Sequence, residues 1–342
     1  MLILIPQWPL ASTFLACQMA GFATNLFLSA LLSQLFIAEW VAFPAMHQKS
    51  LASLLRIGKW QAVAQGGGLV AGQADRYLLG AFLQPQYVGY YSIAQRLEEA
   101  IYIGVLKVGE ILFPFFSSLQ GEGDERVGDL FFRAAWVLNV LAVSVLGALI
   151  PVAGNVLYLW TGAEVAAEGQ RVLIVLALAG ILGSGTNVFT FYLLANGRTK
   201  TSAAISLVTA LATLGTSAVA LPFFGWPAAG WSSCAGALAQ IVVMTLLLRR
   251  SFNLPDIWLR VWHFVLMPIV AGVAGAVLLG FWIAGYEFSQ SVIWWRVAGW
   301  YAFSAAAILA VVIAASSVGP YGEICRRDLH RIVMRFIPAR SV

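Results

Sequence analysis

The stretch that decides the fold runs from residue 59 to residue 120 and reads KWQAVAQGGGLVAGQADRYLLGAFLQPQYVGYYSIAQRLEEAIYIGVLKVGEILFPFFSSLQ. It predicts two consecutive membrane-spanning helices, a glycine-rich one over about Trp60–Phe82 and a longer one over about Val88–Ser117. Each apolar run reaches the ~20 residues that a bilayer requires. The loop between them falls around Gln84–Pro85. Both helices carry charged residues at depths where lipid disfavours them, and such residues point to function.

The second helix carries four charged side chains on one face, here called the charged row: Arg96, Glu99, Lys107 and Glu110. At about 100° per residue they fall within an arc of roughly 80°, and at ~1.5 Å per residue the row is roughly 21 Å long. Glu98 lies on the far side. A row this long cannot stay at one surface of a hydrocarbon core ~30 Å thick. Because each charge at mid-bilayer costs at least ~2.5–3.5 kcal/mol, the row must face other helices or a wet cavity.

Two interpretations of the charged row remain open. In one, it lines a substrate cavity; in the other, its members only neutralise one another inside a helix bundle. Depth allows a contact between Asp75 and Arg96, since both lie ~12 Å from the same membrane face in an antiparallel hairpin. Lys107 can pair with Glu110 across one helical turn. With these pairs formed, Arg76 is left as a spare cation, that is, one without an acidic partner.

Glycine and proline mark unusual backbone positions in these two helices. Gly66, Gly67 and Gly68 are followed by Gly72, and the spacing of the last two lets membrane helices approach closely. A hinge that bends during transport is the alternative. Pro114 removes a backbone hydrogen bond and predicts a kink near the end of the second helix.

Composition indicates an all-α polytopic membrane protein. Hydrophobic residues make up 61% of the 342 residues and charged residues only 10%, with a mean hydropathy of +0.84. Soluble domains average about 25% charged residues. We expect about nine transmembrane helices, over residues 10–32, 60–82, 88–117, 134–150, 172–195, 202–223, 228–248, 264–283 and 295–315.

The distribution of Lys and Arg predicts the orientation. About fifteen of the twenty lie around residues 49–59, 120–133, 196–201 and 249–260 and in the C-terminal tail. Positive residues accumulate in cytoplasmic loops, so we expect these loops and the C-terminus in the cytoplasm. This pattern explains the net charge of +5 without nucleic acid, which we do not expect as a partner.

The sequence shows no catalytic or metal-binding signature. Cys17, Cys234 and Cys325 are scattered singly, as are the three histidines. Glu98 and Glu99 are adjacent and therefore lie on different faces of a helix, which is unsuited to paired acid–base chemistry. We expect no enzyme activity, no catalytic residues, no metal and no cofactor.

Several segments resemble a known family. The runs Gln73–Gly80 and Val88–Arg96 closely resemble the mid-chain signature of bacterial polysaccharide flippases, which belong to the multidrug/oligosaccharidyl-lipid/polysaccharide (MOP) exporter superfamily. Ile111–Ser117 and Asn196–Arg198 are similar to its recurring segments. The resemblance is good over about residues 50–250 and loose elsewhere.

The resemblance implies two six-helix lobes, often with two extra C-terminal helices. By this mapping, residues 1–48 are the end of the first lobe with one span, and residues 49–255 are the second six-helix lobe. Residues 256–342 are the extra helix hairpin and a basic cytoplasmic tail. Most of the first lobe is then missing, through a real truncation, a start-site error or completion by a partner.

The resemblance also implies a function. Members move a polyprenyl-pyrophosphate-linked oligosaccharide across the bacterial inner membrane for surface polysaccharide synthesis, among membrane lipids and with polysaccharide assembly proteins as candidate partners. It assigns contacts with the anionic substrate to Arg96, Lys107 and Arg76, and charge tuning or ion coupling to Asp75, Glu99 and Glu110. The alternatives are an ion-coupled multidrug efflux protein of the same superfamily and a truncated membrane scaffold that does not transport.

Overall fold

The computed structural model describes residues 10–36, 48–119, 124–252, 256–284 and 294–336. The chain forms two compact units, residues 1–55 and 56–342. The first unit holds α1 (Leu10–Phe36) and the start of α2 (Gln48–Phe82), and the second holds the remaining helices. Across the described ranges the chain contains helices and no strand, which confirms the all-α class.

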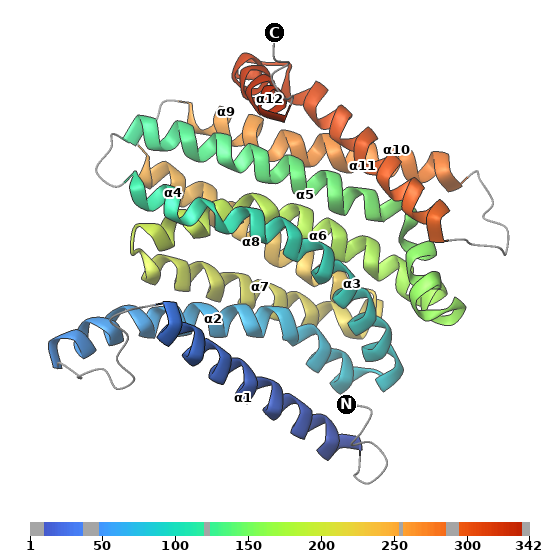
Figure 1. The fold of residues 1–342 in the computed structure, drawn as a ribbon. Helices are drawn as coiled ribbons and strands as arrows, with labels where there is room; N and C mark the ends of the chain where they lie inside the picture. The colour runs from blue at the N-terminus through green and yellow to red at the C-terminus, as the bar shows by residue number, and fades with distance from the viewer. Residues whose placement is uncertain (1–9, 37–47, 120–123, 253–255, 285–293, 337–342) are drawn as a thin grey trace. The chain divides into compact units, whose positions relative to one another are not determined.

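The second unit continues after α2 with helices joined by short connections (Figure 1). They are α3 (Pro85–Glu110), α4 (Leu112–Ser118), α5 (Asp124–Thr161), α6 (Ala163–Ala195), α7 (Thr199–Phe224), α8 (Ala228–Ser251), α9 (Ile257–Val261), the π-helix η1 (Trp262–Leu266), α10 (Met267–Ala284), α11 (Trp294–Ser316) and α12 (Gly322–Phe336).

Seven stretches of the described chain are long and apolar enough to cross a membrane. They are residues 85–118, 125–161, 163–195, 199–224, 228–250, 257–283 and 294–316. The polytopic class is therefore confirmed. The two other expected spans do not reach the same standard: α1 holds a shorter apolar stretch, Ala16–Leu32. In α2, Asp75, Arg76 and several glutamines lower the mean hydropathy.

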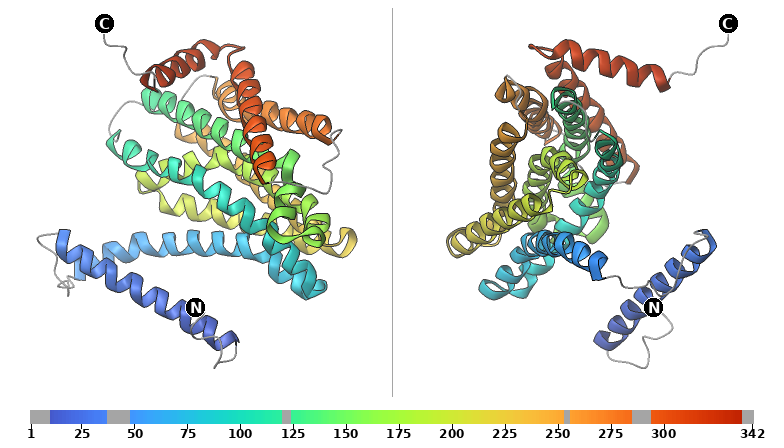
Figure 2. Two further views of the ribbon diagram at one scale, coloured as in Figure 1. Left: turned by 45° about the vertical axis from the view of Figure 1, so that its right-hand side comes forward. Right: turned by 90° about the vertical axis from the view of Figure 1, so that its left-hand side faces the viewer.

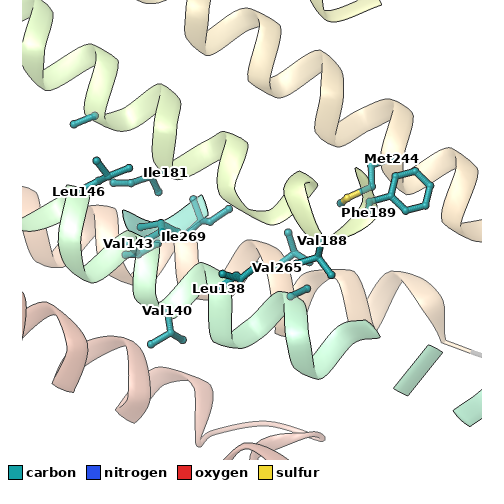
Figure 3. Close-up of a cluster of buried hydrophobic side chains, with 14 of the residues drawn as sticks. Leu138, Val140, Val143, Leu146, Ile181, Val188, Phe189, Met244, Val265 and Ile269 are labelled. Carbon is teal, nitrogen blue, oxygen red and sulfur yellow. The ribbon is translucent and has the colours of Figure 1, made fainter. Parts of the chain in front are cut away.

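Helices α5 and α6 form the centre of the second unit. In their most apolar stretches 72% and 67% of the residues are buried, against 17% for the stretch that covers α3 and α4. Figure 3 shows apolar side chains of α5, α6, α8, η1 and α10 in this core, among them Leu146, Ile181, Phe189, Met244 and Val265. Helices α10 and α11 pack on α5 (Figure 2). Since α3 is peripheral, one of its faces is not covered by the other described helices of the second unit.

Local sequence explains where these helices begin and break. Pro85 starts α3, where its missing N–H leaves no helical bond unmade. Near Pro114, where a kink was expected, the helical hydrogen bonding is interrupted at Ile111, between α3 and α4; the bend itself stays a prediction. Pro114 cannot donate to the carbonyl of Glu110 four residues earlier. Gly225 has φ of 69°, a left-handed conformation that glycine adopts without strain, and it ends α7.

The basic loops gather at one end of the second unit. Three aromatic side chains join the helix ends there, with ring centroids 5.2–5.9 Å apart: Phe131 of α5, Tyr192 of α6 and Phe252 after α8. Lys59 of α2 and Lys200 of α7 both lie 5.6 Å from the ring of Trp60. The alternation of basic loops in the sequence therefore corresponds to one basic end in three dimensions.

The basic helix α12 is docked at this same end. Arg133 of α5 forms a two-pronged ion pair with Asp328 of α12. Cys325 of α12 is buried, and burial raises the pKa of its thiol to about 12. Arg335 was also expected in this basic tail, but its side chain and the whole of Arg340 lie outside the described residues.

The glycine cluster of α2 makes one close helix contact. A Cβ built on Gly67 would meet the backbone of Ser206 in α7 at 3.2 Å, whereas a Cβ built on Gly68 or Gly72 would meet no described residue of another helix within 4 Å. Close packing is thus confirmed for the cluster, but at a different glycine from the pair whose spacing suggested it. The alternative of a hinge stays a prediction.

Substitution of Gly67 tests this contact. We expect Gly67→Leu to lower the stability of the purified chain by about 1–3 kcal/mol, because the new side chain forces α2 away from α7. Gly68→Leu is the matched control and should change stability little. Thermal unfolding in detergent measures both. Equal effects of the two substitutions would contradict a close approach at Gly67.

Candidate functional site

Asp75 is the centre of a buried polar cluster that joins four helices. Its carboxylate, on α2, lies within hydrogen-bond distance of four hydroxyl groups, although the residue is only 2% exposed. The donors are Tyr91 of α3 (2.9 Å), Ser217 of α7, Ser232 of α8 (2.8 Å) and Ser233 of α8 (3.1 Å). An isolated buried carboxylate is very unfavourable, so these donors are what permits an acid at this position.

The geometry can accommodate Asp75 in either protonation state. Each hydroxyl has one hydrogen, and that of Ser232 has two acceptors within reach, Asp75 and the backbone oxygen of Ala229 at 2.6 Å. With Asp75 ionised, Ser232 can donate to the carboxylate. With Asp75 protonated, the carboxyl can donate to Ser232, whose own hydrogen then goes to Ala229. A proton can therefore be gained or lost without leaving a hydroxyl unpaired.

A second polar chain connects α2 to the charged row on α3. Arg76 donates from Nε to Oε1 of Gln95 (2.9 Å) and from a terminal nitrogen to Gln73 (3.1 Å). Gln95 donates in turn to Glu99 (2.9 Å) and to the backbone oxygen of Gly72 (3.1 Å). Arg76 is therefore linked through one glutamine to the row. Both of its partners are neutral, and its expected role as a spare cation stays a prediction.

All four members of the charged row are exposed on the outer face of α3. Lys107 pairs with Glu110 at 2.8 Å, as expected from their spacing. Arg96 makes no ion pair or side-chain hydrogen bond with any described residue. Glu98 lies on the opposite, buried face, close to Gly180 of α6. In the described part of the chain, the row is thus not enclosed in a bundle where its charges could only neutralise one another.

The contact that hairpin depth allowed between Asp75 and Arg96 is not formed. Asp75 turns towards α7 and α8, while Arg96 lies on the exposed face of α3. Depth along a hairpin constrains the distance from the membrane surface but not the direction around each helix. The hydroxyl groups of α7 and α8, rather than an arginine, accompany the buried acid.

Several residues of the site have no distinctive signal in the sequence. Ser217, Ser232 and Ser233 lie more than 140 residues after Asp75 in helices rich in small residues, where serine is common. Tyr91 and Gln95 fall within the Val88–Arg96 run and, four residues apart, share one face of α3. Their position relative to Arg96 and Glu99 could have indicated which face of α3 meets α2.

The chain is similar to known proteins both in sequence and in fold. Residues 19–166 match the model of a family described as "Polysaccharide biosynthesis protein". The predicted family resemblance is confirmed. A solved structure described as "Lipid II flippase MurJ, inward closed conformation" matches with a TM-score of 0.60 and 16% sequence identity, over 90% of this chain and 60% of that one. That likeness shows a shared fold, and the chain spans about 60% of that flippase. No curated protein matches the sequence.

The Asp75 cluster makes a stability prediction. We expect Asp75→Ala to lower the free energy of unfolding by at least ~1–3 kcal/mol, because it leaves several buried hydroxyl groups without their shared acceptor. Asp75→Asn keeps one acceptor oxygen and should be milder. The control is Glu110→Gln, which weakens the exposed ion pair with Lys107, worth ~1 kcal/mol or less. Unfolding of the purified chain in detergent gives the comparison, and an Asp75→Ala effect no larger than the control would refute the cluster.

Proposed function

We propose that this chain is part of a flippase that moves a polyprenyl-pyrophosphate-linked oligosaccharide across the inner membrane for surface polysaccharide synthesis. The observation that carries the proposal is the exposed charged row on α3, in a protein otherwise built of apolar helices. The family match and the MurJ-like fold support the lipid-linked class of substrate. The proposed activity is transport and not an enzymatic reaction.

In this proposal Arg96 and Lys107 attract the anionic head group. Arginine and lysine supply charge-assisted hydrogen bonds to phosphate oxygens, which are stronger than bonds between neutral groups. Arg96 is exposed and free of protein partners among the described residues, so it can bind an anion without first breaking an ion pair. Glu99 and Glu110 then limit the net charge of the row, and the polyprenyl tail stays in lipid.

Arg76 has a subsidiary role in binding. It lies behind the row and reaches Glu99 only through Gln95. We assign it to holding Gln95 and Glu99 in place while contributing positive charge to the site. The same chain of contacts connects the row to the helix that carries Asp75.

Asp75 is the candidate for ion coupling. It is a buried acid that can gain or lose a proton with its hydroxyl partners satisfied, and it lies where α2, α3, α7 and α8 meet. A change in its charge alters the hydrogen bonds between α2 and the other three helices. Such a change can favour one arrangement of α2 and α3 over another, which is what alternating access requires.

The arrangement of the chain in the membrane follows the same proposal. Residues 1–48 belong to the end of a first lobe, residues 49–255 form the second lobe, and residues 256–342 form an extra hairpin and tail. The gathering of basic loops at one end supports a cytoplasmic C-terminus under the positive-inside rule. The substrate site then lies between this lobe and a first lobe, and polysaccharide assembly proteins remain proposed partners.

Binding of a fluorescent polyprenyl-pyrophosphate-linked sugar to the purified full chain tests this function. We expect Arg96→Ala and Lys107→Ala each to weaken binding roughly tenfold, since a hydrogen bond to a charged group contributes about 1.5–3 kcal/mol. Arg249→Ala removes an exposed arginine at the end of α8 and is the matched control. A neutral polyprenol-linked sugar should bind wild type as weakly as an Arg96→Ala/Lys107→Ala double variant binds the pyrophosphate form.

Three outcomes would contradict parts of the proposal. If Arg96→Ala and Lys107→Ala bind the pyrophosphate form like the control variant, the row does not recognise the head group. Uptake of labelled cationic drugs into vesicles, without binding of the lipid-linked sugar, would favour the efflux alternative. Binding without transfer between leaflets of a vesicle would favour the scaffold alternative or a chain that needs a partner lobe.

A further inference from the structure

Two neighbouring cavities at the basic end of the second unit lie away from the charged row. One is a polar pocket of about 180 Å³, bounded by α5, α9 and α12, whose lining includes Arg133, Arg260, Tyr321, Arg327 and Arg331. The other is a mainly apolar groove of about 350 Å³. Seven apolar residues of α3, α4 and α5 line it: Val108, Leu112, Phe115, Leu130, Ala134, Val137 and Leu138.

The pocket and the groove adjoin each other. Arg133, Asp328 and Arg331 line both of them, so these charged side chains lie at the boundary between the apolar groove and the polar pocket. A ligand that filled both would have a polar, charged end and an apolar end. Membrane lipids have this composition, whereas a soluble metabolite would leave the groove empty.

The pocket carries excess positive charge. Four arginines and two aspartates line it, which leaves a net charge of +2. Asp328 is paired with Arg133, and Asp129 with Arg260. Arg327 and Arg331 remain exposed, and Arg331 reaches Asp328 only at 3.9 Å. The excess charge therefore comes from the two arginines of α12 and favours an anion.

One buried donor in the pocket lacks an acceptor. The Nε of Arg260 is inaccessible to solvent and has no hydrogen-bond partner among the described residues. The guanidinium lies over the ring of Tyr321, 5.4 Å from its centroid, which fixes its position. An unpaired buried donor costs about 1–3 kcal/mol. The Arg260 side chain is thus a fixed part of the pocket lining.

We propose that an anionic phospholipid binds here, with its phosphate among Arg260, Arg327 and Arg331 and one acyl chain in the groove. Arginine matches the geometry of phosphate oxygens, and basic pockets between membrane helices at the cytoplasmic side bind anionic head groups. The lipid would connect α12 to α4 and α5 and hold the basic helix against the bundle.

This lipid is distinct from the transported substrate. Val108 lies roughly 140° around α3 from the centre of the charged row, at about 100° per residue. A molecule in the groove therefore does not meet Arg96 or Lys107. The inference stands on the two cavities and does not depend on the proposed flippase activity.

Lipid-dependent thermal unfolding of the full chain, purified in detergent and stripped of lipid, tests the proposal. Phosphatidylglycerol should raise the unfolding midpoint in a saturable way, and phosphatidylcholine should not. In Arg327→Ala/Arg331→Ala the apparent affinity for phosphatidylglycerol should fall at least roughly tenfold. Arg326→Ala/Arg249→Ala removes the same charge from exposed positions outside both cavities and should stay close to wild type.

A second variant separates the acyl chain from the head group. Ala134→Phe fills the groove and should reduce the shift produced by phosphatidylglycerol, with each shift measured from the variant's own lipid-free midpoint. Inorganic phosphate alone should shift wild type and Ala134→Phe equally and weakly. The proposal would be overturned if both arginine double variants lost affinity for phosphatidylglycerol equally. It would also be overturned if phosphatidylcholine, or inorganic phosphate alone, raised the unfolding midpoint as much as phosphatidylglycerol does.

Discussion

A carboxylate inside an apolar helix bundle is tolerated only where hydrogen-bond donors surround it, and the arrangement around Asp75 follows from that constraint. The donors come from the next helix, α3, and from α7 and α8, more than 140 residues away, so satisfying one side chain requires α2 to lie against all three in a particular rotation. The close approach of Gly67 to Ser206 belongs to the same contact. The position of α2, the most polar of the long helices, is therefore specified by polar contacts more than by hydrophobic burial.

Helix α3 has two faces with opposite requirements. Its inner face places Tyr91 and Gln95 against α2 and Glu98 and Val105 against the core. Its outer face presents the charged row, where isolated charges would be costly in contact with lipid. The connection from Arg76 through Gln95 to Glu99 joins the two faces. Arg76 follows Asp75 directly in α2, so this chain of hydrogen bonds begins beside the buried acid.

Much of the fold could be predicted because apolar length and charge placement are local properties. Helix ends near Phe82 and Pro85, the break before Pro114 and the pairing of Lys107 with Glu110 all depend on residues within a few positions of one another. The charged row was also predictable, since helical periodicity alone determines which residues share a face.

The partners of Asp75 could not be predicted in the same way. Whether a buried acid meets an arginine or a serine depends on the rotation of helices that are brought together by tertiary packing, and serine in a membrane helix has no distinctive pattern. The same limit applies to the docking of α12, where Asp328 pairs with Arg133 across 195 residues. The basic character of α12 was evident in the sequence, but its partner in α5, Arg133, was not.

The central claim is that the outer face of α3 meets water and not lipid. Labelling of single cysteines in membranes tests it most directly, with Arg96→Cys and Lys107→Cys compared with Val108→Cys, an exposed apolar position roughly 140° around the same helix from the centre of the row. We predict that a membrane-impermeant maleimide, supplied to both sides, labels the two row positions much faster than position 108. Row positions that stay unlabelled by this reagent but react with a lipid-soluble one would contradict the account.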